Sequence, residues 1–388
     1  MSPAPVLQRY SAKKALIPIR FRFGGGVGGF EHDPKKPDIC AVMTNGDDRF
    51  GYLMPGPRET VDMPGIAAGY RVVAQCKHND VNCIATTNST DSKIYREETA
   101  TVRQFTAATS EYFTIADNEA LSTGNIDFTF AIWVRADTSV ASRGVMSKSN
   151  ATGNQREYGI DTSSSLPRFV ISSDGTGGTV VTLTSTGSAL AIDTWYLIIV
   201  WHDATANTLN IQVNNGAVDS VAHTLGVFDS TAAFQIGRNE QAGLYWNGRI
   251  GPTGFWKAVL TSAERTALYN NGVPLRSGHL VGLGITTPTS YWNMDEASGD
   301  AIDSVGANNL TDTNTVTTAA ANYNYWAIKQ TVTSAVATWI GSFHDGTDSI
   351  CAVGMGINDA FRYTVDDWTN IVTSTLTEIG RASCRERV

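Results

Sequence analysis

Alternating apolar and polar positions dominate the middle of the chain and predict β-strands. Leu209, Ile211 and Val213 alternate with polar residues, as in a strand that buries one face. The Asn-Gly pair at 215–216 follows and provides the left-handed backbone angles that a tight hairpin turn needs. Residues 195–201 are apolar throughout, as in a strand buried between two sheets. This part of the chain therefore predicts an antiparallel sandwich.

One short helix is predicted among these strands. Thr261 and Glu264 have the spacing of a capping box, in which each residue satisfies a backbone N–H of the first turn. The Asn-Gly pair at 271–272 provides the glycine that commonly ends a helix. We expect this helix to pack against one end of the sandwich.

A second pattern recurs three times in the chain. Cys40, Cys83 and Cys351 are each followed by an Asp eight residues later and by a Tyr twelve residues later. Each copy predicts a hairpin, with an apolar strand at the Cys and a polar turn at the Asp. The forty-three positions from Cys40 to Cys83 approach the length of one propeller blade of four strands. We therefore expect an incomplete β-propeller that is interrupted between its second and third copies.

These patterns give the expected domain order. About two blades occupy residues 1–104, a jelly-roll sandwich occupies 105–326, and a truncated blade resumes at 327–377. The final segment, 378–388, resembles the translation of a sequencing adapter and is excluded from fold reasoning. We expect the natural protein to continue beyond Thr377.

The repeated cysteines are expected to be small buried apolar residues. Equivalent positions on neighbouring blades are expected to lie too far apart for a disulfide, which needs Cα atoms within about 7 Å. A bond between Cys76 and Cys83 across a hairpin is the less favoured alternative. The His residues lack metal-ligand spacing, and their recurrence before each Cys favours a structural role.

Residues 105–309 resemble the laminin-G-like domains, which have a concanavalin-A-like jelly-roll fold. The similarity lies in the opening strands at 112–117 and 127–134, the central hairpin at 194–216, and the closing strand and helix at 246–269. A segment that usually comes first in these domains comes last here, at 291–308, which suggests circular permutation. Chain ends that lie close together allow such a domain to be permuted and inserted.

The resemblance implies candidate ligands, because many such domains bind calcium and a glycan. Asp303, Asn308 and Asp295 offer the oxygen atoms that Ca²⁺ prefers. The favoured alternative is that Asp303 caps its own turn. Tyr245 and Trp246 are candidates for a stacking platform under a sugar, with core packing of the Trp as the favoured alternative.

Composition and charge narrow the class of protein. With 42% hydrophobic and 17% charged residues, the chain is neither disordered nor a long coiled coil. Its longest apolar run, at 195–201, is too short to span a membrane as a helix. The net charge of −8 argues against binding to nucleic acid.

We therefore expect a non-catalytic protein that binds a carbohydrate or a surface, such as a component of a phage or viral particle. A glycan or a cell-surface or particle protein is the expected partner. The segment 1–5 lacks the apolar core of a signal peptide, so an extracellular or virion-associated location is expected without that route. A bacterial adhesin exported by another route remains open.

The alternative is a fragment of a sialidase-like glycoside hydrolase with an inserted lectin-like domain. The segment 17–20, with Arg20, weakly resembles the first arginine motif of such enzymes. The segment 363–368 resembles a degenerate copy of their repeated aspartate box. No catalytic residue is assigned, since a pair of carboxylates for glycosidic chemistry cannot be identified.

Overall fold

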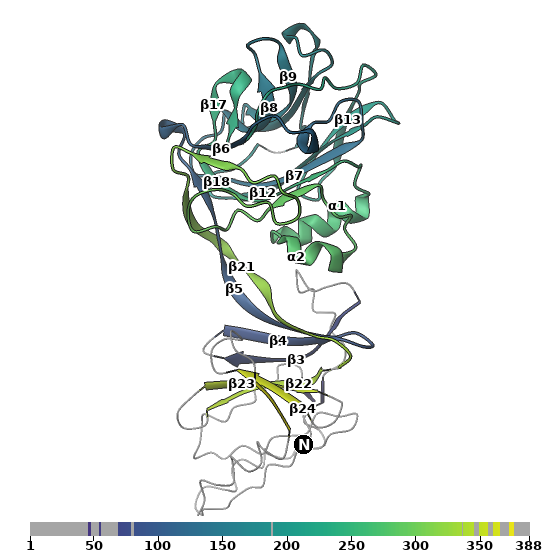
Figure 1. Ribbon diagram of the computed structural model, residues 1–388, viewed down its shortest axis with the longest axis vertical. Coiled ribbons are helices and arrows are strands. Elements are labelled where there is room, and N and C mark those ends of the chain that lie inside the picture. Colours follow the sequence, from purple (N-terminus) through teal and green to yellow (C-terminus); the bar gives the residue numbers. More distant parts are fainter. Residues whose placement is uncertain are drawn as a thin grey trace, which may run out of the picture. The chain divides into compact units, whose positions relative to one another are not determined.

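The computed structural model describes residues 46–47, 54–55, 69–78, 81–187, 189–335, 337–344, 349–355, 360–364 and 372–375. The chain divides into two compact units (Figure 1). Residues 99–325 form the first, which we call the sandwich unit. Residues 69–98 and those from 326 onward belong to the second, which we call the flanking unit. The boundaries expected from the sequence lie at 104/105 and 326/327.

The first sheet of the sandwich unit is antiparallel, with the strand order β14-β13-β12-β7-β18-β5. Strand β19 pairs with β18, and β21 pairs with β5. The bounds are β5 (Ser92–Phe105), β7 (Phe128–Ala136), β12 (Trp195–Asp203), β13 (Thr208–Val213), β14 (Val218–Ala222), β18 (Gly248–Trp256), β19 (Ser290–Trp292) and β21 (Thr317–Val332).

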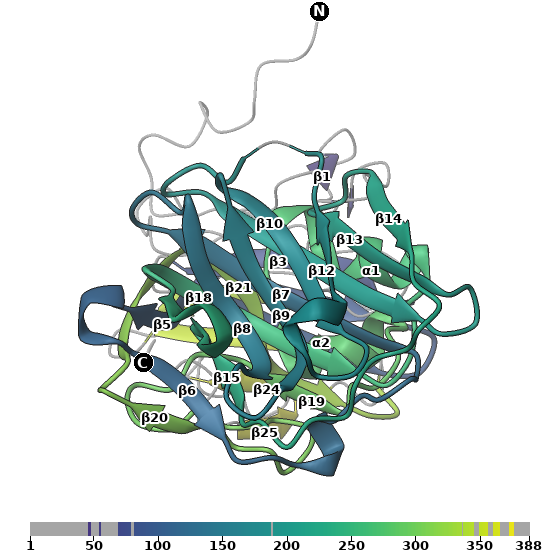
Figure 2. The ribbon, with the colours of Figure 1, turned by 90° about the horizontal axis from the view of Figure 1, so that it is seen from above.

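The second sheet has seven antiparallel strands in the order β11-β10-β9-β8-β15-β6-β20. Strands β8, β9 and β10 run side by side in Figure 2. The bounds are β6 (Tyr112–Ile115), β8 (Ser142–Asn150), β9 (Gln155–Ser163), β10 (Leu166–Ser172), β11 (Val180–Thr184), β15 (Phe234–Ile236) and β20 (Thr311–Thr313). A two-stranded hairpin, β16 (Arg238–Asn239) and β17 (Leu244–Tyr245), follows β15.

The hydrophobic core of the sandwich unit lies between these two sheets. Phe130 of β7 and Phe255 of β18 stack with ring centroids 4.4 Å apart, and Tyr158 of the opposite sheet lies 4.8 Å from Phe130. Because successive residues of a strand point to opposite faces, each sheet contributes every second side chain to this core. The expectation of an all-β jelly-roll sandwich is confirmed.

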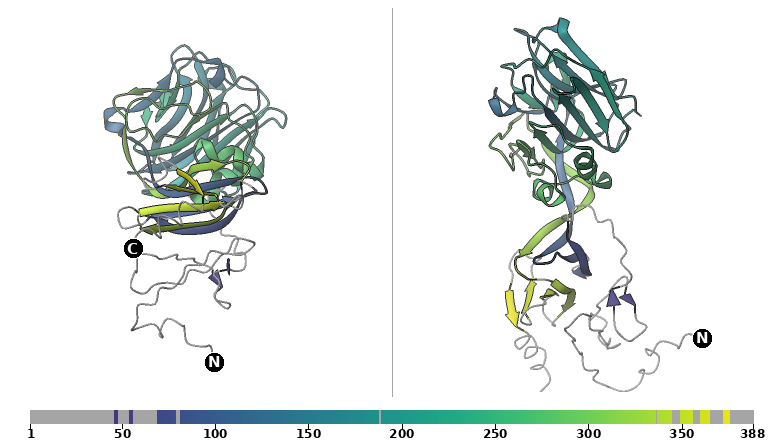
Figure 3. Two further views of the ribbon diagram at one scale, coloured as in Figure 1. Left: turned by 60° about the horizontal axis from the view of Figure 1, so that its bottom comes forward. Right: turned by 90° about the vertical axis from the view of Figure 1, so that its right-hand side faces the viewer.

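Two short helices cover the outer face of the first sheet, α1 (Ser262–Tyr269) and α2 (Ser277–Leu280) (Figure 3). Both halves of the predicted capping box between Thr261 and Glu264 are present. Helix residues Leu268 and Leu280 pack into a cluster with Trp201 of β12. Strand β12 is thus buried on both faces, which explains its uninterrupted apolar run.

The remaining short elements are 3₁₀ helices of three residues each. They are η2 (Ala107–Thr109), η3 (Glu119–Leu121), η4 (Gly177–Thr179), η5 (Glu240–Ala242), η6 (Asn270–Gly272) and η7 (Val281–Leu283). None of the helices in the described ranges is long and apolar enough to cross a membrane.

The turn between β13 and β14 differs from its predicted form. Asn214, rather than the Asn-Gly pair at 215–216, has the left-handed φ of 55°. Its side chain explains the preference, because Asn214 Oδ1 accepts a hydrogen bond from the backbone N–H of Leu197, 2.9 Å away. Asn tolerates this backbone region better than most residues.

The flanking unit contains the predicted hairpins at Cys83 and Cys351. Strand β4 (Val81–Thr87) pairs with β3 (Arg71–His78) and with the start of β5. The segments β22 (Ala337–His344), β23 (Ser349–Met355), β24 (Ala360–Thr364) and β25 (Val372–Thr375) form a four-stranded meander. The two-residue strands β1 (Gly46–Asp47) and β2 (Met54–Pro55) pair with each other. Among the described residues no sheet closes into a ring.

Cys83 and Cys351 share one hydrophobic cluster in this unit. The expectation that these equivalent positions lie far apart is therefore wrong. The cause is that side chains of β4 and β23 point into the same core. The first copy of the pattern, at Cys40, lies outside the described residues, as does the segment 17–20.

Candidate functional site

The β16–β17 hairpin lies over the outer face of the seven-stranded sheet, beside β8 (Figure 1). Gly144 of β8 makes this approach possible. A Cβ atom at Gly144 would lie 2.2 Å from the backbone N of Asn239 and 2.4 Å from the carbonyl O of Leu244. Both distances are far below van der Waals contact, so only glycine fits between the hairpin and the sheet.

A polar row crosses the outer face of the sheet under this hairpin. Gln235 of β15 pairs in register with Ser147 of β8 on one side and with Thr114 of β6 on the other. The residues that flank Gln235, Phe234 and Ile236, point into the core instead. We call this outer face and its hairpin the hairpin face; its principal side chains are those of Tyr112, Asp161, Arg168, Gln235, Arg238, Asn239, Glu240 and Tyr245.

A network around Asp161 holds one side of the hairpin. Arg168 donates from Nε and Nη2 to the two carboxylate oxygens of Asp161, at 2.7 and 2.9 Å. Asn239 donates from Nδ2 to Asp161 Oδ2 at 3.0 Å. Such a two-pronged Arg–carboxylate pair fixes orientation as well as charge. The guanidinium of Arg168 is partly exposed, whereas Asp161 is buried.

Glu240 connects the hairpin to the sheet on the other side. Its carboxylate accepts hydrogen bonds from Gln235 Nε2 at 3.0 Å and from Asn150 Nδ2 at 3.2 Å. Its backbone N–H donates to Ser147 Oγ at 3.3 Å, and that hydroxyl donates to the carbonyl of Arg238. Side-chain hydrogen bonds thus connect the hairpin to the sheet, in addition to the backbone that joins them.

An aromatic pair with a cation above it lies at the base of the hairpin. The guanidinium carbon of Arg238 is 5.0 Å from the ring centroid of Tyr112 and 5.3 Å from that of Tyr245. The two rings are 6.2 Å apart and tilted by 53°. All three side chains are half-buried, so they are held in place and still reach the surface.

Three buried polar atoms of the hairpin face lack a hydrogen-bond partner within the described structure. They are Gln235 Oε1, Arg238 Nε and Asn239 Oδ1. Buried polar atoms are nearly always satisfied, because leaving one unpaired costs about 1–3 kcal/mol. Gln235 and Asn239 donate hydrogen bonds from their side-chain amide nitrogens, and the Arg238 guanidinium lies over the rings of Tyr112 and Tyr245, so the fold places all three side chains.

The two residues predicted to form a sugar platform have different environments. Trp246 is fully buried in the core, and its Nε1 donates to the carbonyl of Arg249 at 3.3 Å. Tyr245 points to the hairpin face beside Tyr112. The two side chains therefore do not form one platform. Sequence reasoning missed Tyr112, although its alternation with the core residue Phe113 was the signal that could have revealed it.

The three candidate calcium ligands are engaged elsewhere. Asp303 Oδ1 accepts backbone N–H groups of Tyr291, Val305 and Gly306, and its Oδ2 accepts that of Asn308. Asp303 therefore caps its own turn, the alternative favoured above. Asn308 Oδ1 accepts from Asn118 at 2.6 Å, and Asp295 pairs with Arg276. All three side chains therefore already have partners within the chain, and the described ranges contain no group of three or more His, Cys, Asp or Glu residues placed to hold a metal.

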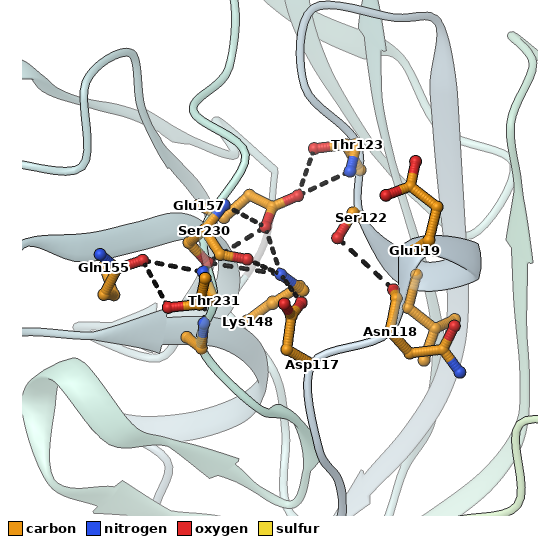
Figure 4. A network of polar contacts seen from close by, with 12 residues as sticks. Asp117, Asn118, Glu119, Ser122, Thr123, Lys148, Gln155, Glu157, Ser230 and Thr231 are labelled. Atoms are coloured by element: carbon orange, nitrogen blue, oxygen red, sulfur yellow. Dashed lines mark hydrogen bonds and ion pairs between the residues drawn. The ribbon is translucent and has the colours of Figure 1, made fainter.

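A buried ion pair forms a second polar cluster in the sandwich unit. Figure 4 shows Lys148 between Glu157 and Asp117, with Nζ to carboxylate distances of 2.7 and 2.9 Å. Lys148 Nζ also donates to the carbonyl of Ser230, and Glu157 accepts from the N–H and hydroxyl groups of Thr123 and Ser230. Burial raises the pKa of Glu157 above its ordinary value, while Lys148 opposes that shift. Because every partner is internal, we assign this cluster to positioning the loops at 117–123 and 230–231.

Comparisons with known proteins agree with this fold. Residues 107–264 match the Laminin_G_3 family model, which is described as the concanavalin A-like lectin/glucanases superfamily. No curated protein sequence matches the chain. A solved protein of Bacteroides ovatus, provisionally described as carbohydrate binding, is 13% identical, with 64% of this chain and 71% of that one covered and a TM-score of 0.45.

Two further solved structures are similar at lower TM-scores. A heptameric SAP-like pentraxin from Limulus polyphemus is 8% identical, covers 57% of this chain and 96% of its own, and has a TM-score of 0.40. The CBM40 module of a Ruminococcus gnavus IT-sialidase is 14% identical, covers 42% and 98%, and has a TM-score of 0.32. Residues 107–264 therefore match this superfamily in sequence and have the two-sheet architecture of a jelly-roll sandwich.

Proposed function

We propose that the protein binds carbohydrate through the hairpin face of the sandwich unit and does so without catalysis. The observation that carries this proposal is the set of three buried polar atoms without partners, on Gln235, Arg238 and Asn239. A sugar hydroxyl can both donate and accept, so it satisfies amide oxygens and a guanidinium N–H alike.

The chemistry of the hairpin face suits a neutral sugar. Tyr112 and Tyr245 offer aromatic surface, and sugars place their C–H faces on such rings while hydroxyls reach polar groups around them. The charges balance, with Arg168 and Arg238 opposite Asp161 and Glu240. A carboxylated sugar would find no excess of positive charge there.

The direct test is a glycan array probed with the full chain, which includes neutral glycans and sialyllactose as the acidic comparison. Sialyllactose is the ligand with which the Ruminococcus CBM40 was solved. We expect binding to neutral glycans, and we expect Tyr245→Ala and Gln235→Ala each to weaken it at least about tenfold, which corresponds to about 1.4 kcal/mol. Binding to no glycan, or binding unaffected by both substitutions, would overturn the proposal.

Two matched controls make the result specific. Tyr70→Ala removes a Tyr that also has a cation over its ring, Lys93 at 4.8 Å, but lies in the flanking unit. It should leave glycan binding unchanged. Gly144→Ala should displace the hairpin and abolish binding, whereas Gly159→Ala should be tolerated, because its Cβ would come no closer than 3.5 Å to any atom.

The alternative function is glycoside hydrolysis. The two carboxylates of the hairpin face are occupied by partners, Asp161 by Arg168 and Asn239, and Glu240 by Gln235 and Asn150. This pairing favours a positioning role over attack on a glycosidic bond. Release of reducing sugar by the full chain, lost in Glu240→Gln, would support the hydrolase instead.

The flanking unit serves in this proposal as a platform. Its meander of β22 to β25 has the four-stranded antiparallel form of one propeller blade, which supports the propeller hypothesis for this part of the chain. A sugar-binding sandwich on such a platform suits a phage or viral particle component, or another extracellular surface protein.

A further inference from the structure

Three cysteines meet in the core of the flanking unit. Cys76 on β3 is directly opposite Cys83 on β4, and Cys351 comes from β23. The Sγ atoms of Cys76 and Cys351 are 3.8 Å apart, although the two residues are separated by 275 positions in the sequence. All three belong to the same hydrophobic cluster. All three are free thiols.

The environment of these thiols favours reaction among themselves. Hydrogen bonds from Cys351 and Cys76 lower the pKa of Cys83, to about 4, against the opposing effect of burial. Hydrogen bonding with its neighbours and burial keep the pKa of Cys351 high. These hydrogen bonds place the three sulfur atoms in mutual contact. Cys76 has 8% of its surface exposed, and the other two have none, so a small oxidant reaches the cluster at Cys76.

We propose that the cluster is an oxidisable site in which a peroxide joins Cys76 to Cys351 through a disulfide. The S–S bond forms as the two thiols give up two protons and two electrons. The O–O bond of hydrogen peroxide accepts both electrons and breaks, so that two water molecules leave. The sulfur atoms must approach from 3.8 Å to about 2.05 Å, which side-chain rotation in facing strands can provide.

Cys351 is the partner for Cys76 because their sulfur atoms already touch across the core. Cys83 contacts both and remains the third, unlinked thiol. The link would close a loop that contains the whole sandwich unit. A cross-link over so long a loop removes much of the freedom of the unfolded chain, so the oxidised form should resist unfolding.

The test uses the full chain with Cys40→Ser and Cys384→Ser, which leaves only these three cysteines. After treatment with hydrogen peroxide, alkylation and non-reducing digestion, mass spectrometry should find the Cys76 and Cys351 peptides joined, with Cys83 alkylated. Reduction should separate the peptides. The melting temperature of the oxidised protein should lie several degrees above that of the reduced protein.

Single substitutions in that background complete the test. Cys83→Ala should keep the link, whereas Cys76→Ala and Cys351→Ala should each remove both the link and the rise in melting temperature. A link between Cys76 and Cys83 would overturn the proposed pairing. Three alkylated cysteines after peroxide treatment would overturn the site itself. Both results are read from the protein in which all three cysteines of the cluster are present, so they do not depend on the folding of the single-alanine variants.

Discussion

The outer faces of the two sheets of the sandwich unit are both covered, but by opposite chemistry. Over the first sheet, α1 and α2 bury Trp133, Trp201 and Trp256 under leucines. Over the second sheet, the β16–β17 hairpin covers Ser147, Asp161 and Gln235 with further polar groups. Both coverings restrict exposure of the sheet to water.

The difference separates stabilisation from recognition. Apolar burial contributes roughly 25 cal/mol per Å² and needs no partner of defined geometry, so the helix-covered face has a structural role. A polar covering gains little net stability, since its hydrogen bonds replace bonds to water. Polar groups with fixed hydrogen-bond directions are suited to recognising a ligand. The proposed binding site therefore lies on this face.

The strongest test of this comparison truncates one large side chain on each face. Trp256→Ala should lower the free energy of unfolding by about 4 kcal/mol, because it empties a buried site and leaves the carbonyl of Thr286 without its donor. Tyr245→Ala should cost about 1 kcal/mol or less, as expected for a half-buried side chain. Urea denaturation followed by Trp fluorescence measures both. Equal losses would contradict the division of roles.

Buried charge provides the next test. Lys148→Met leaves Glu157 buried without its cation and should lower the free energy of unfolding by about 3 kcal/mol. The double substitution Lys148→Met and Glu157→Gln should recover part of that loss, since no unpaired charge remains. Glycan binding by the double variant should persist. Its disappearance would place this cluster in recognition rather than in structure.

A smaller effect is expected at the start of α1, the helix that covers the apolar face. Burial alone would raise the pKa of Glu264, but hydrogen bonds from Thr286 and Thr261 outweigh it and hold the pKa at about 2. Since the folded pKa lies below the unfolded value of 4.5, the stabilisation is present above pH 4.5 and is lost as the pH falls toward 2.

Glu264→Gln should therefore cost about 1 kcal/mol at pH 7 and less at pH 3. Thermal melts of both proteins across this range measure the difference. A cost that does not depend on pH would show that the carboxylate charge contributes nothing. The neighbouring exposed residue Ser262, changed to Ala, is the control for helix propensity.

The smallest expected effect concerns calcium, which stays a prediction from the family resemblance. At a calcium concentration near the dissociation constant, a bound ion would raise the free energy of unfolding by about 0.4 kcal/mol. Melts in millimolar calcium and in a chelator measure this. An ion near Asp303 would have to displace four backbone donors. A calcium-dependent rise in melting temperature that is absent from Asp303→Asn would identify that site. Identical melts in both solutions would remove the metal hypothesis.

The sandwich could be predicted from sequence because its strands and capping box depend on local patterns. Strand periodicity located β7, β12 and β13, and the Thr261–Glu264 spacing located α1. The binding face could not be located in the same way. Asp161 and Asn239 meet only because the hairpin folds over β9, and Gly144 reveals that approach only once both segments are in place.

Trp246 shows the limit of judging residues by type. Next to Tyr245 in sequence, it points to the opposite side of the chain and into the core, as alternation along a strand requires. The meeting of Cys76 with Cys351 was likewise hidden, because no local pattern records which strands share a core.

The sandwich unit begins and ends at neighbouring points, where Thr99 donates from Oγ1 to Oδ1 of Asn324 at 3.2 Å. A module whose entry and exit are adjacent can be exchanged for another with little change to its host. Recombination could thus replace one recognition head by another in a single event, and an engineer could graft a reporter or a different lectin between the same two positions.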